Sequence, residues 1–342
     1  MKNKIVLAST FLAASSLATA EILINEFLSF EGFIDMSYQH AHTDTEPPSS
    51  GGSDNRFGVD QVEINWLFNF DKVTGVVDFA YTGSDAVGSA VNSGDATQLE
   101  QAYATYAPGY GGAITVGRFE SMLGFEATEP TELYQSSSAY DRGILPGYGE
   151  GVQYTYASDE FFWGAALVSS FSNYDTERLG GSGDSNYALE VAASYAMDRM
   201  SFFLGGFYED SEGTSDGSTH AINAYVTYEM GAWIFAGELN MGNTEVNAYN
   251  LGGTDDDAMN GLLMVNYAYS DVASITGRIS FEKVDSDNEE SSQTKWTLAH
   301  GYAFTDNLSL VTEVSFVDGV YETDREAEFD ALRAAVAWIF AF

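Results

Sequence analysis

The stretch Leu332-Arg-Ala-Ala-Val-Ala-Trp-Ile-Phe-Ala-Phe342 ends the sequence and decides the fold class. From Leu332 to Phe342, every even-numbered residue is apolar or aromatic. A period of two points successive side chains to opposite faces of a β-strand. Three aromatic residues in the last five positions are rare in a soluble strand. The pattern therefore predicts a membrane strand with one face toward lipid and the other toward a lumen.

The opposite end of the sequence has the pattern of an export signal. Two lysines and a short apolar stretch occupy residues 1–14, and Ala18-Thr19-Ala20 offers a small-x-small cleavage site. The apolar stretch is too short for a spanning helix, which needs about 18 residues. We therefore predict a signal peptide at 1–20, removed before Glu21, and a single domain at 21–342.

The composition excludes several classes of function. Acidic residues outnumber basic ones by 51 to 13, for a formal net charge of -38 at pH 7. Nucleic-acid binding needs a basic footprint, which this chain lacks. Cysteine is absent, which excludes disulfides and metal–thiolate sites. The negative charge would favour cations near a pore mouth, although a proteome adapted to saline water would give the same composition.

Sixteen segments of about ten residues alternate in polarity and are bounded by turn signals. They lie at 27–40, 58–70, 73–83, 97–107, 112–120, 147–157, 161–173, 186–197, 200–210, 219–230, 232–242, 259–269, 272–283, 293–304, 308–318 and 329–342. Short connections alternate with long ones rich in Gly, Ser, Asp and Asn. This pattern predicts an all-β fold, a transmembrane antiparallel up-and-down β-barrel of about 16 strands with short periplasmic turns and long extracellular loops. Counts of 14 or 18 stay open, because 84–96 or 243–257 could hide a hairpin.

Aromatic and polar residues take opposite faces of these segments. Trp66, Trp233 and Trp296 have the outward parity, whereas Glu63, Glu238 and Lys295 have the other. A polar inner face predicts a water-filled channel rather than a packed barrel core.

The longest connection, Ser121 to Pro146, is the third on the extracellular side. A loop of this size in a compact fold is usually functional or disordered. Its many apolar residues predict that it folds back into the barrel, packs on the wall and narrows the bore. Its charged residues, the candidates for the constriction, are Glu126, Glu129, Glu132, Asp141 and Arg142.

Three short motifs around this connection resemble a known family. They are Val116-Gly117-Arg118-Phe119, Leu123-Gly124-Phe125-Glu126 and Gly151-Val152-Gln153-Tyr154. They are similar to the OmpL-like β-barrel porins, with the general diffusion porins of Gram-negative bacteria as distant relatives. The terminal Phe342 also resembles the signature that the outer-membrane insertion machinery recognises. The resemblance implies sixteen strands, an inward-folded third loop, an outer-membrane location in contact with lipid and lipopolysaccharide, and a homotrimer.

Three basic residues share the lumen parity within one arc of the wall, namely Arg278, Lys295 and Arg333. Carboxylates of the third loop could face this arc and set up a transverse field at the narrowest point, a common device for solute selection. Alternatively, the bases neutralise lumen acids such as Glu282 and Glu313. The scarcity of bases separates this chain from the general diffusion porins, whose eyelet holds a dense basic cluster.

The sequence leaves open whether the Arg118 side chain faces the lumen or the outside of the barrel. It shares parity with Ile114 and Val116, which face outward, but a bulge near Gly117 would turn it into the lumen. We include it among the predicted pore-lining residues.

The sequence gives little support for a catalytic site. The four histidines, His40, His42, His220 and His300, do not cluster, and no Gly-x-Ser-x-Gly elbow occurs. His40 and His42 lie near Asp44 and could imitate an outer-membrane protease, but a solvated loop is the simpler interpretation.

Two acidic stretches, 255–257 and 285–290, suggest calcium. The second lacks the glycine and the final glutamate of an EF-hand loop, so we predict no defined metal site and no cofactor.

The sequence thus predicts an outer-membrane porin that passes small hydrophilic solutes, cations preferentially, by passive diffusion. A barrel enzyme and a non-conducting structural or adhesive barrel are the alternatives. No residue pattern names the permeant, and none fixes the oligomeric state.

Overall fold

The computed structural model describes residues 21–46, 51–82, 96–171, 187–211, 217–245, 255–286, 289–322 and 326–342. The predicted signal peptide at 1–20 lies outside these residues. So do most of the two stretches, 84–96 and 243–257, that could hide a further hairpin.

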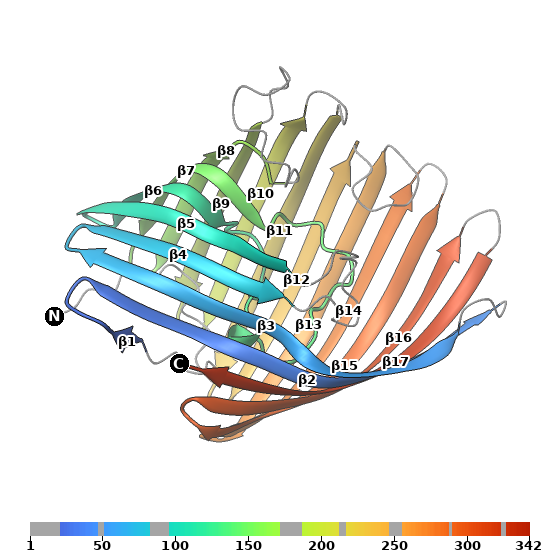
Figure 1. The fold of residues 1–342 in the computed structure, drawn as a ribbon. Helices are drawn as coiled ribbons and strands as arrows, with labels where there is room; N and C mark the ends of the chain where they lie inside the picture. Colours follow the sequence, from blue (N-terminus) through green and yellow to red (C-terminus); the bar gives the residue numbers. More distant parts are fainter. Residues whose placement is uncertain are drawn as a thin grey trace.

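The described chain is almost entirely β-strand (Figure 1). The strands are β1 (Ile22–Leu23), β2 (Leu28–Glu46), β3 (Gly52–Phe70), β4 (Val73–Thr82), β5 (Ala96–Gly109), β6 (Gly112–Glu120), β7 (Tyr148–Ala157), β8 (Phe161–Val168), β9 (Tyr187–Met197), β10 (Met200–Ser211), β11 (Gly217–Met230), β12 (Trp233–Thr244), β13 (Asp256–Ser270), β14 (Ala273–Ser286), β15 (Glu290–Thr305), β16 (Leu308–Glu322) and β17 (Glu326–Ala341). A single 3-10 turn, η1 (Pro130–Glu132), interrupts the loop between β6 and β7. No helix in the described ranges is long and apolar enough to cross a membrane.

Strands β2 to β17 close into one antiparallel barrel of sixteen strands. Each strand pairs with the next along the chain, and β17 pairs with β2 to complete the ring. Closure leaves no unpaired sheet edge, as a lipid environment requires. Each of the sixteen predicted segments coincides with one of these strands, so the predicted fold is confirmed. The small strand β1 adds to the start of β2.

Strand lengths differ from the prediction mainly at the loop end. β2 runs on to Glu46 and β3 begins at Gly52, because ladder hydrogen bonds continue beyond the region where side chains alternate in polarity. β8 is shorter than predicted and ends at Val168.

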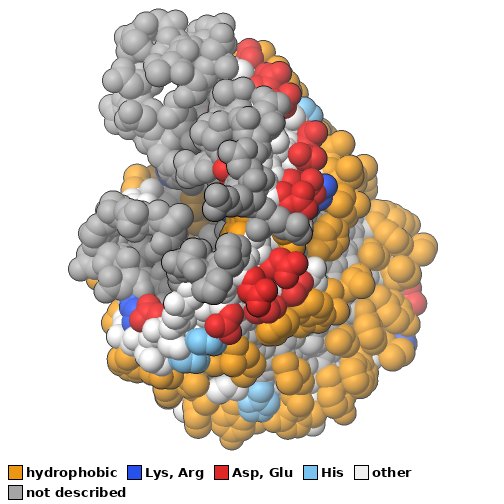
Figure 2. All heavy atoms as spheres, turned by 90° about the vertical axis from the view of Figure 1, so that its right-hand side faces the viewer, with side chains coloured by type: hydrophobic (Ala, Val, Ile, Leu, Met, Phe, Trp, Pro, Cys, Tyr) orange, Lys and Arg blue, Asp and Glu red, His pale blue; other side chains and the backbone are white. Residues whose placement is uncertain are grey.

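The faces follow the predicted alternation. On β14 and β15, Arg278 and Lys295 are 3% and 2% exposed, whereas Ile279 and Trp296 are 45% and 41% exposed. Figure 2, which looks onto the loop end, shows hydrophobic side chains around the outside of the barrel and acidic side chains along the rim. The outer wall is thus apolar and the interior polar, as a membrane barrel requires.

Candidate functional site

The connection between β6 and β7, residues Ser121 to Gly147, is called the third loop below; its green trace in Figure 1 runs within the barrel. At its start, the Ser121 hydroxyl and the Met122 N–H both donate to Oε1 of Glu190 on β9, at 2.7 Å each. The Phe125 N–H donates to Glu238 on β12 at 2.8 Å. Buried carboxylates of the wall therefore hold the first part of the loop.

The later part of the loop is held in the same way. The Ser136 N–H donates to Glu313 on β16 at 2.8 Å, and the Asp141 and Arg142 N–H groups donate to Glu282 on β14 at 2.9 and 3.1 Å. A loop without regular structure leaves main-chain N–H groups that must find partners once water is excluded. Each carboxyl oxygen can accept more than one hydrogen bond, so these wall acids fix the loop in place.

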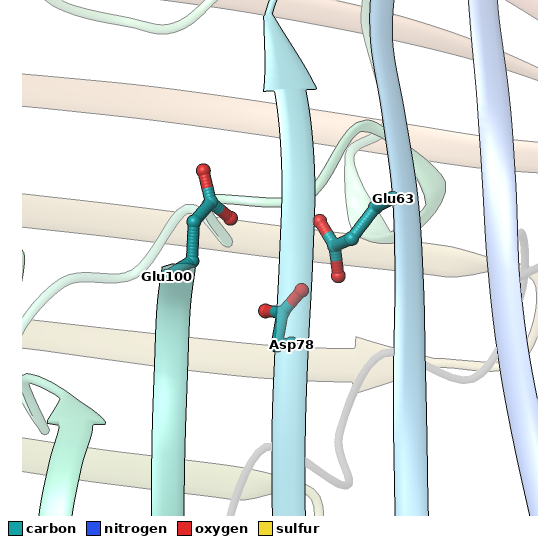
Figure 3. A group of neighbouring side chains, drawn as sticks. All are labelled: Glu63, Asp78 and Glu100. Atoms are coloured by element: carbon teal, nitrogen blue, oxygen red, sulfur yellow. The ribbon is translucent and has the colours of Figure 1, made fainter. Parts of the chain in front are cut away.

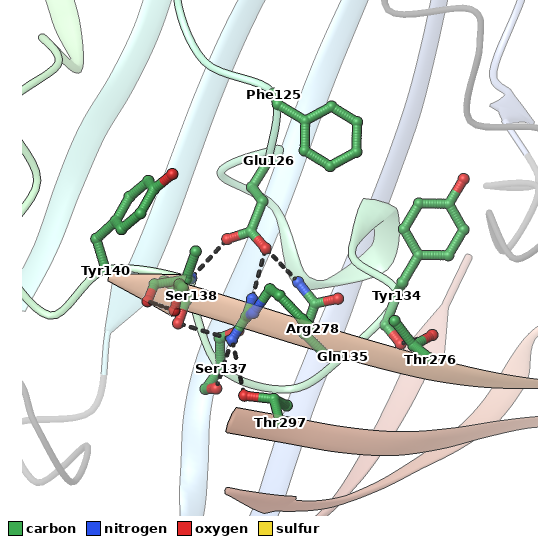
Figure 4. A network of polar contacts seen from close by, with 12 residues as sticks. Phe125, Glu126, Tyr134, Gln135, Ser137, Ser138, Tyr140, Thr276, Arg278 and Thr297 are labelled. Atoms are coloured by element: carbon green, nitrogen blue, oxygen red, sulfur yellow. Dashed lines mark hydrogen bonds and ion pairs between the residues drawn. The ribbon is translucent and has the colours of Figure 1, made fainter. Parts of the chain in front are cut away.

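Arg278 on β14 joins two parts of the third loop (Figure 4). Its guanidinium forms an ion pair with Glu126 and donates to the carbonyls of Ser137 and Ser138 at 2.9 and 3.0 Å. Glu126 also accepts from the Ala139 N–H at 2.6 Å. The Arg278 side chain is fully buried, and a buried charge of this kind is stable only when it is paired and hydrogen-bonded.

A second ion-pair group surrounds Asp141. Lys295 Nζ on β15 lies 2.6 Å from Oδ1, and Arg333 on β17 contacts both oxygens, with Nη2 at 2.8 Å from Oδ2. Burial alone would raise the pKa of the Asp141 carboxyl, but Lys295 and Arg333 outweigh burial and hold the pKa well below its ordinary value. The carboxylate therefore stays ionised at neutral pH.

The three predicted lumen bases do meet carboxylates of the third loop. They form direct ion pairs and do not face them across an open bore. Arg278 pairs with Glu126, and Lys295 and Arg333 pair with Asp141. No bore separates these opposite charges, so they neutralise each other where they meet and tie the loop to the β14–β17 side of the wall.

The other two arginines predicted to line the pore, Arg142 and Arg118, do not take part in these ion pairs. The Arg142 guanidinium carbon lies 5.7 Å from the centre of the Tyr321 ring. The pairing of β6 with β5 and β7 is unbroken at Gly117, so the bulge expected there is absent. Arg118 lies over Tyr148, with its guanidinium carbon 5.5 Å from the ring centre. Its guanidinium donates to the main-chain oxygen of Glu100 at 2.9 Å and does not join the Glu126 network.

A cavity of about 740 Å³ lies between the third loop and the opposite wall. Among the described residues that line it, seven are carboxylic acids and none is lysine, arginine or histidine. The acids are Glu63, Glu120, Glu126, Glu129, Glu132, Asp159 and Glu160.

The predicted constriction residues Glu129 and Glu132 belong to this acidic lining. Burial and the adjacent Glu63 carboxyl raise the pKa of Glu129 well above its ordinary value. Burial, followed by the charges of Glu31 and Glu63, also raises the pKa of Glu132. These carboxyls of the loop therefore take up protons more readily than exposed ones.

Sequence reasoning missed one cluster on the same wall. Glu63, Asp78 and Glu100 are 1%, 0% and 7% exposed and lie together on β3, β4 and β5 (Figure 3). Parity alone places Glu63 and Asp78 inside. Glu100 joins them through a register shift between β4 and β5 at Asp78, an extra residue that no periodic pattern signals.

His42 and His300 contact neighbours on the outer face or rim. His42 lies between Ser53 and Asp44, at 2.8 and 3.3 Å, but it is opposite Leu332 in the register and so points away from the lumen. His300 contacts the Tyr269 hydroxyl at 2.7 Å, also on the outer face.

A closed barrel with an apolar exterior, a polar interior and a loop held inside it defines an outer-membrane porin. The chain belongs to the family described as "Putative beta-barrel porin-2, OmpL-like", which matches residues 28–342. This confirms the resemblance found in the motifs around Arg118.

Solved structures support the fold. An anion-selective porin from Comamonas acidovorans is 12% identical with a TM-score of 0.65, over 92% of this chain and 99% of that one. The outer membrane channel DcaP of Acinetobacter baumannii is 12% identical with a TM-score of 0.64, over 92% and 97%. The trimer form of OmpT, an outer membrane protein of Vibrio cholerae, is 11% identical with a TM-score of 0.61, over 92% and 99%. A search of curated protein sequences gave no match.

Proposed function

We propose that this porin is a passive diffusion channel for small hydrophilic solutes and that it prefers cations. The observation that carries the preference is the cavity beside the third loop: among the described residues its lining holds seven acids and no base, and only Glu126 of these acids is in an ion pair. A cleft lined by one sign of charge and enclosed by low-dielectric walls concentrates the opposite ion. The third loop sets the bore, and the lining acids set the sign of the selected ion.

The fold alone does not decide that sign. The Comamonas porin has the same architecture and is named anion-selective. The ion pairs of Arg278, Lys295 and Arg333 cancel the charge of these bases locally, so the bases do not offset the cavity acids that lie outside ion pairs. The mechanism requires no chemical step, and no cofactor is invoked.

The test is reconstitution of the purified protein in planar lipid bilayers. Single-channel steps in symmetric KCl establish conduction, and the zero-current potential in a KCl gradient gives the ratio of cation to anion permeability. We expect stepwise conductance and a potential of the sign that K⁺ permeation produces. Absence of conductance would favour a structural barrel, and the opposite sign of potential would reject the cation preference.

Assembly as a homotrimer is part of the same proposal. It is supported by the trimer form of OmpT from Vibrio cholerae, whose fold this chain shares, and by the apolar outer wall, which would contact lipid, lipopolysaccharide and neighbouring subunits. Native mass spectrometry of the detergent-solubilised protein measures the subunit count directly. N-terminal sequencing of the same sample tests the predicted removal of residues 1–20.

A further inference from the structure

Three buried carboxylates from neighbouring strands converge on the acidic wall. One oxygen from each of Glu63, Asp78 and Glu100 lies within 4.8 Å of the other two. Figure 3 shows the carboxylates of Glu63 and Asp78 turned toward each other, with Glu100 beside them. Oxygens that share one Ca²⁺ ion at about 2.3–2.6 Å cannot lie more than about 5 Å apart, and this cluster meets that condition.

Asp78 has no adequate partner of its own. Its side chain is 0% exposed, and neither carboxylate oxygen accepts a hydrogen bond of good geometry, although the Gln101 amide lies nearby. The buried amide oxygen of Asn65 also lacks a partner, while its nitrogen donates to Glu63 at 2.9 Å. An isolated buried carboxylate is strongly unfavourable, so these oxygens require a proton or a cation.

The other two carboxylates accept hydrogen bonds from neutral donors, and the Arg118 guanidinium donates to the main-chain oxygen of Glu100 and not to its carboxylate. Glu63 accepts from the Gln61 amide at 3.2 Å, and Glu100 accepts from the Gln98 amide at 3.2 Å and the Tyr148 hydroxyl at 3.4 Å. Among the described residues, no lysine or arginine forms an ion pair with any of the three. Neutral donors of this kind orient carboxylates around a metal ion without cancelling their charge.

We propose that Glu63, Asp78 and Glu100 bind one hard divalent cation, Ca²⁺ in preference to Mg²⁺. An all-oxygen ligand set without histidine or cysteine selects Ca²⁺, Mg²⁺ or Mn²⁺ over softer metals. Ca²⁺ accepts six to eight oxygens in flexible geometry, which suits carboxylates carried by three separate strands. Mg²⁺ demands a near-ideal octahedron and retains several of its waters. The Asn65 amide oxygen is available as a neutral ligand.

The cation would also act on the third loop. Glu129 of that loop contacts Glu63 and accepts from the Gln61 amide at 3.3 Å. Two adjacent carboxylates repel each other unless a positive charge lies between them. With a cation, the loop would be tied to the β3–β5 wall as well as to the β14–β17 wall, where Lys295 and Arg333 hold Asp141.

The test is calorimetric titration of CaCl₂ into the full-length mature protein, refolded in detergent without lipopolysaccharide and freed of metal with a chelator. We expect one saturable site per chain. Asp78→Asn and Glu100→Gln should each weaken Ca²⁺ binding by at least about tenfold, because affinity follows the charge of the ligand set. Two substitutions serve as controls that remove an acid elsewhere and should leave binding unchanged. They are Asp71→Asn in the β3–β4 turn and Asp255→Asn before β13.

A second measurement separates the site from a general loss of folding. Because Asp78→Asn removes an unpaired buried charge, the chelated variant should unfold at a higher temperature than the chelated wild type. Added Ca²⁺ should raise the unfolding midpoint of the wild type, as binding to the folded state requires, and should leave the variant unmoved.

Three results would overturn the proposal: no saturable binding to the wild type, binding that survives both substitutions, or binding lost in Asp255→Asn instead. None of these readouts depends on conductance, so the cation site and the channel are tested separately.

Discussion

Arg278 and Glu126 form an ion pair that ties the barrel wall to the third loop, with the arginine side chain fully buried and the glutamate side chain 12% exposed. The same guanidinium donates to the carbonyls of Ser137 and Ser138, so one wall residue fixes two parts of the loop that lie more than ten residues apart in sequence. The position of the loop in the lumen therefore depends strongly on this side chain.

Arg278→Ala should release the third loop. The substitution leaves Glu126 buried without its countercharge, and breaking a buried pair in this way costs about 3–5 kcal/mol. We expect a larger and noisier single-channel conductance and a higher size limit for solutes in liposome-swelling assays. Arg199→Ala, in the exposed turn between β9 and β10, is the matched control and should behave as the wild type. A wild-type conductance in Arg278→Ala would show that the wall carboxylates alone hold the loop.

Two acids at the short-turn end of the cavity should contribute to ion preference. Asp159 and Glu160 are exposed and line the cavity, so they place acidic groups at one of its ends. Replacing both by their amides should lower the ratio of cation to anion permeability, most clearly at low salt, where screening is weak. The zero-current potential in a salt gradient measures the change.

The control for that pair removes the same charge from turns that do not line the cavity. Asp71→Asn combined with Asp306→Asn serves this purpose, since both residues are exposed in other short turns. Asp71 has a φ of 60°, which asparagine tolerates well. An equal effect from both double variants would mean that net charge, and not the cavity lining, sets the preference.

The sequence predicts the barrel well because its pattern is local. A period of two determines which residues of each strand face the lumen, and this placed Arg278, Lys295 and Arg333 on one side of the wall. The loop has no period, so its partners could not be predicted, and the contact between Arg278 and Glu126 emerges only from the folded structure. Glu100 was missed for a related reason, since a single extra residue in β5 reverses the expected parity.

The sequence pattern also failed to predict the main-chain geometry next to Arg118. A bulge near Gly117 was expected because Arg118 otherwise shares parity with outward-facing residues, but the pairing of β6 continues through Gly117 without a shift, although its φ is 136°. A glycine can absorb an unusual main-chain angle without changing the register, so its presence does not by itself signal a bulge.

Deleting Phe342 should impair barrel assembly. The Gly32 N–H donates to the Phe342 carbonyl at 2.8 Å and the Phe342 N–H donates to the Gly32 carbonyl at 2.9 Å, which extends the closure between β2 and β17. Two hydrogen bonds are worth about 1–3 kcal/mol in total, and the ring contacts of Phe342 with Phe30 and Phe340 are lost as well. We expect less heat-modifiable barrel in the outer-membrane fraction of expressing cells. Phe304→Ala, an exposed aromatic at the end of β15, should have no such effect. Normal assembly of the truncated chain would contradict this prediction.

Asp141→Asn should destabilise the protein over most of the pH range. The pKa of Asp141 is lowered in the folded protein, so its contribution to stability is fully present above the ordinary value of about 3.9 and is lost as the pH falls through the lower folded value. The midpoint of heat unfolding should therefore differ between wild type and variant by a constant amount from pH 8 to pH 5. The difference should shrink only in stronger acid, once Asp141 takes up a proton and releases Lys295 and Arg333. Asp285→Asn, an exposed acid on β14, should show no difference at any pH. A difference that disappears between pH 8 and pH 6 would mean that a group other than Asp141 controls this attachment of the loop.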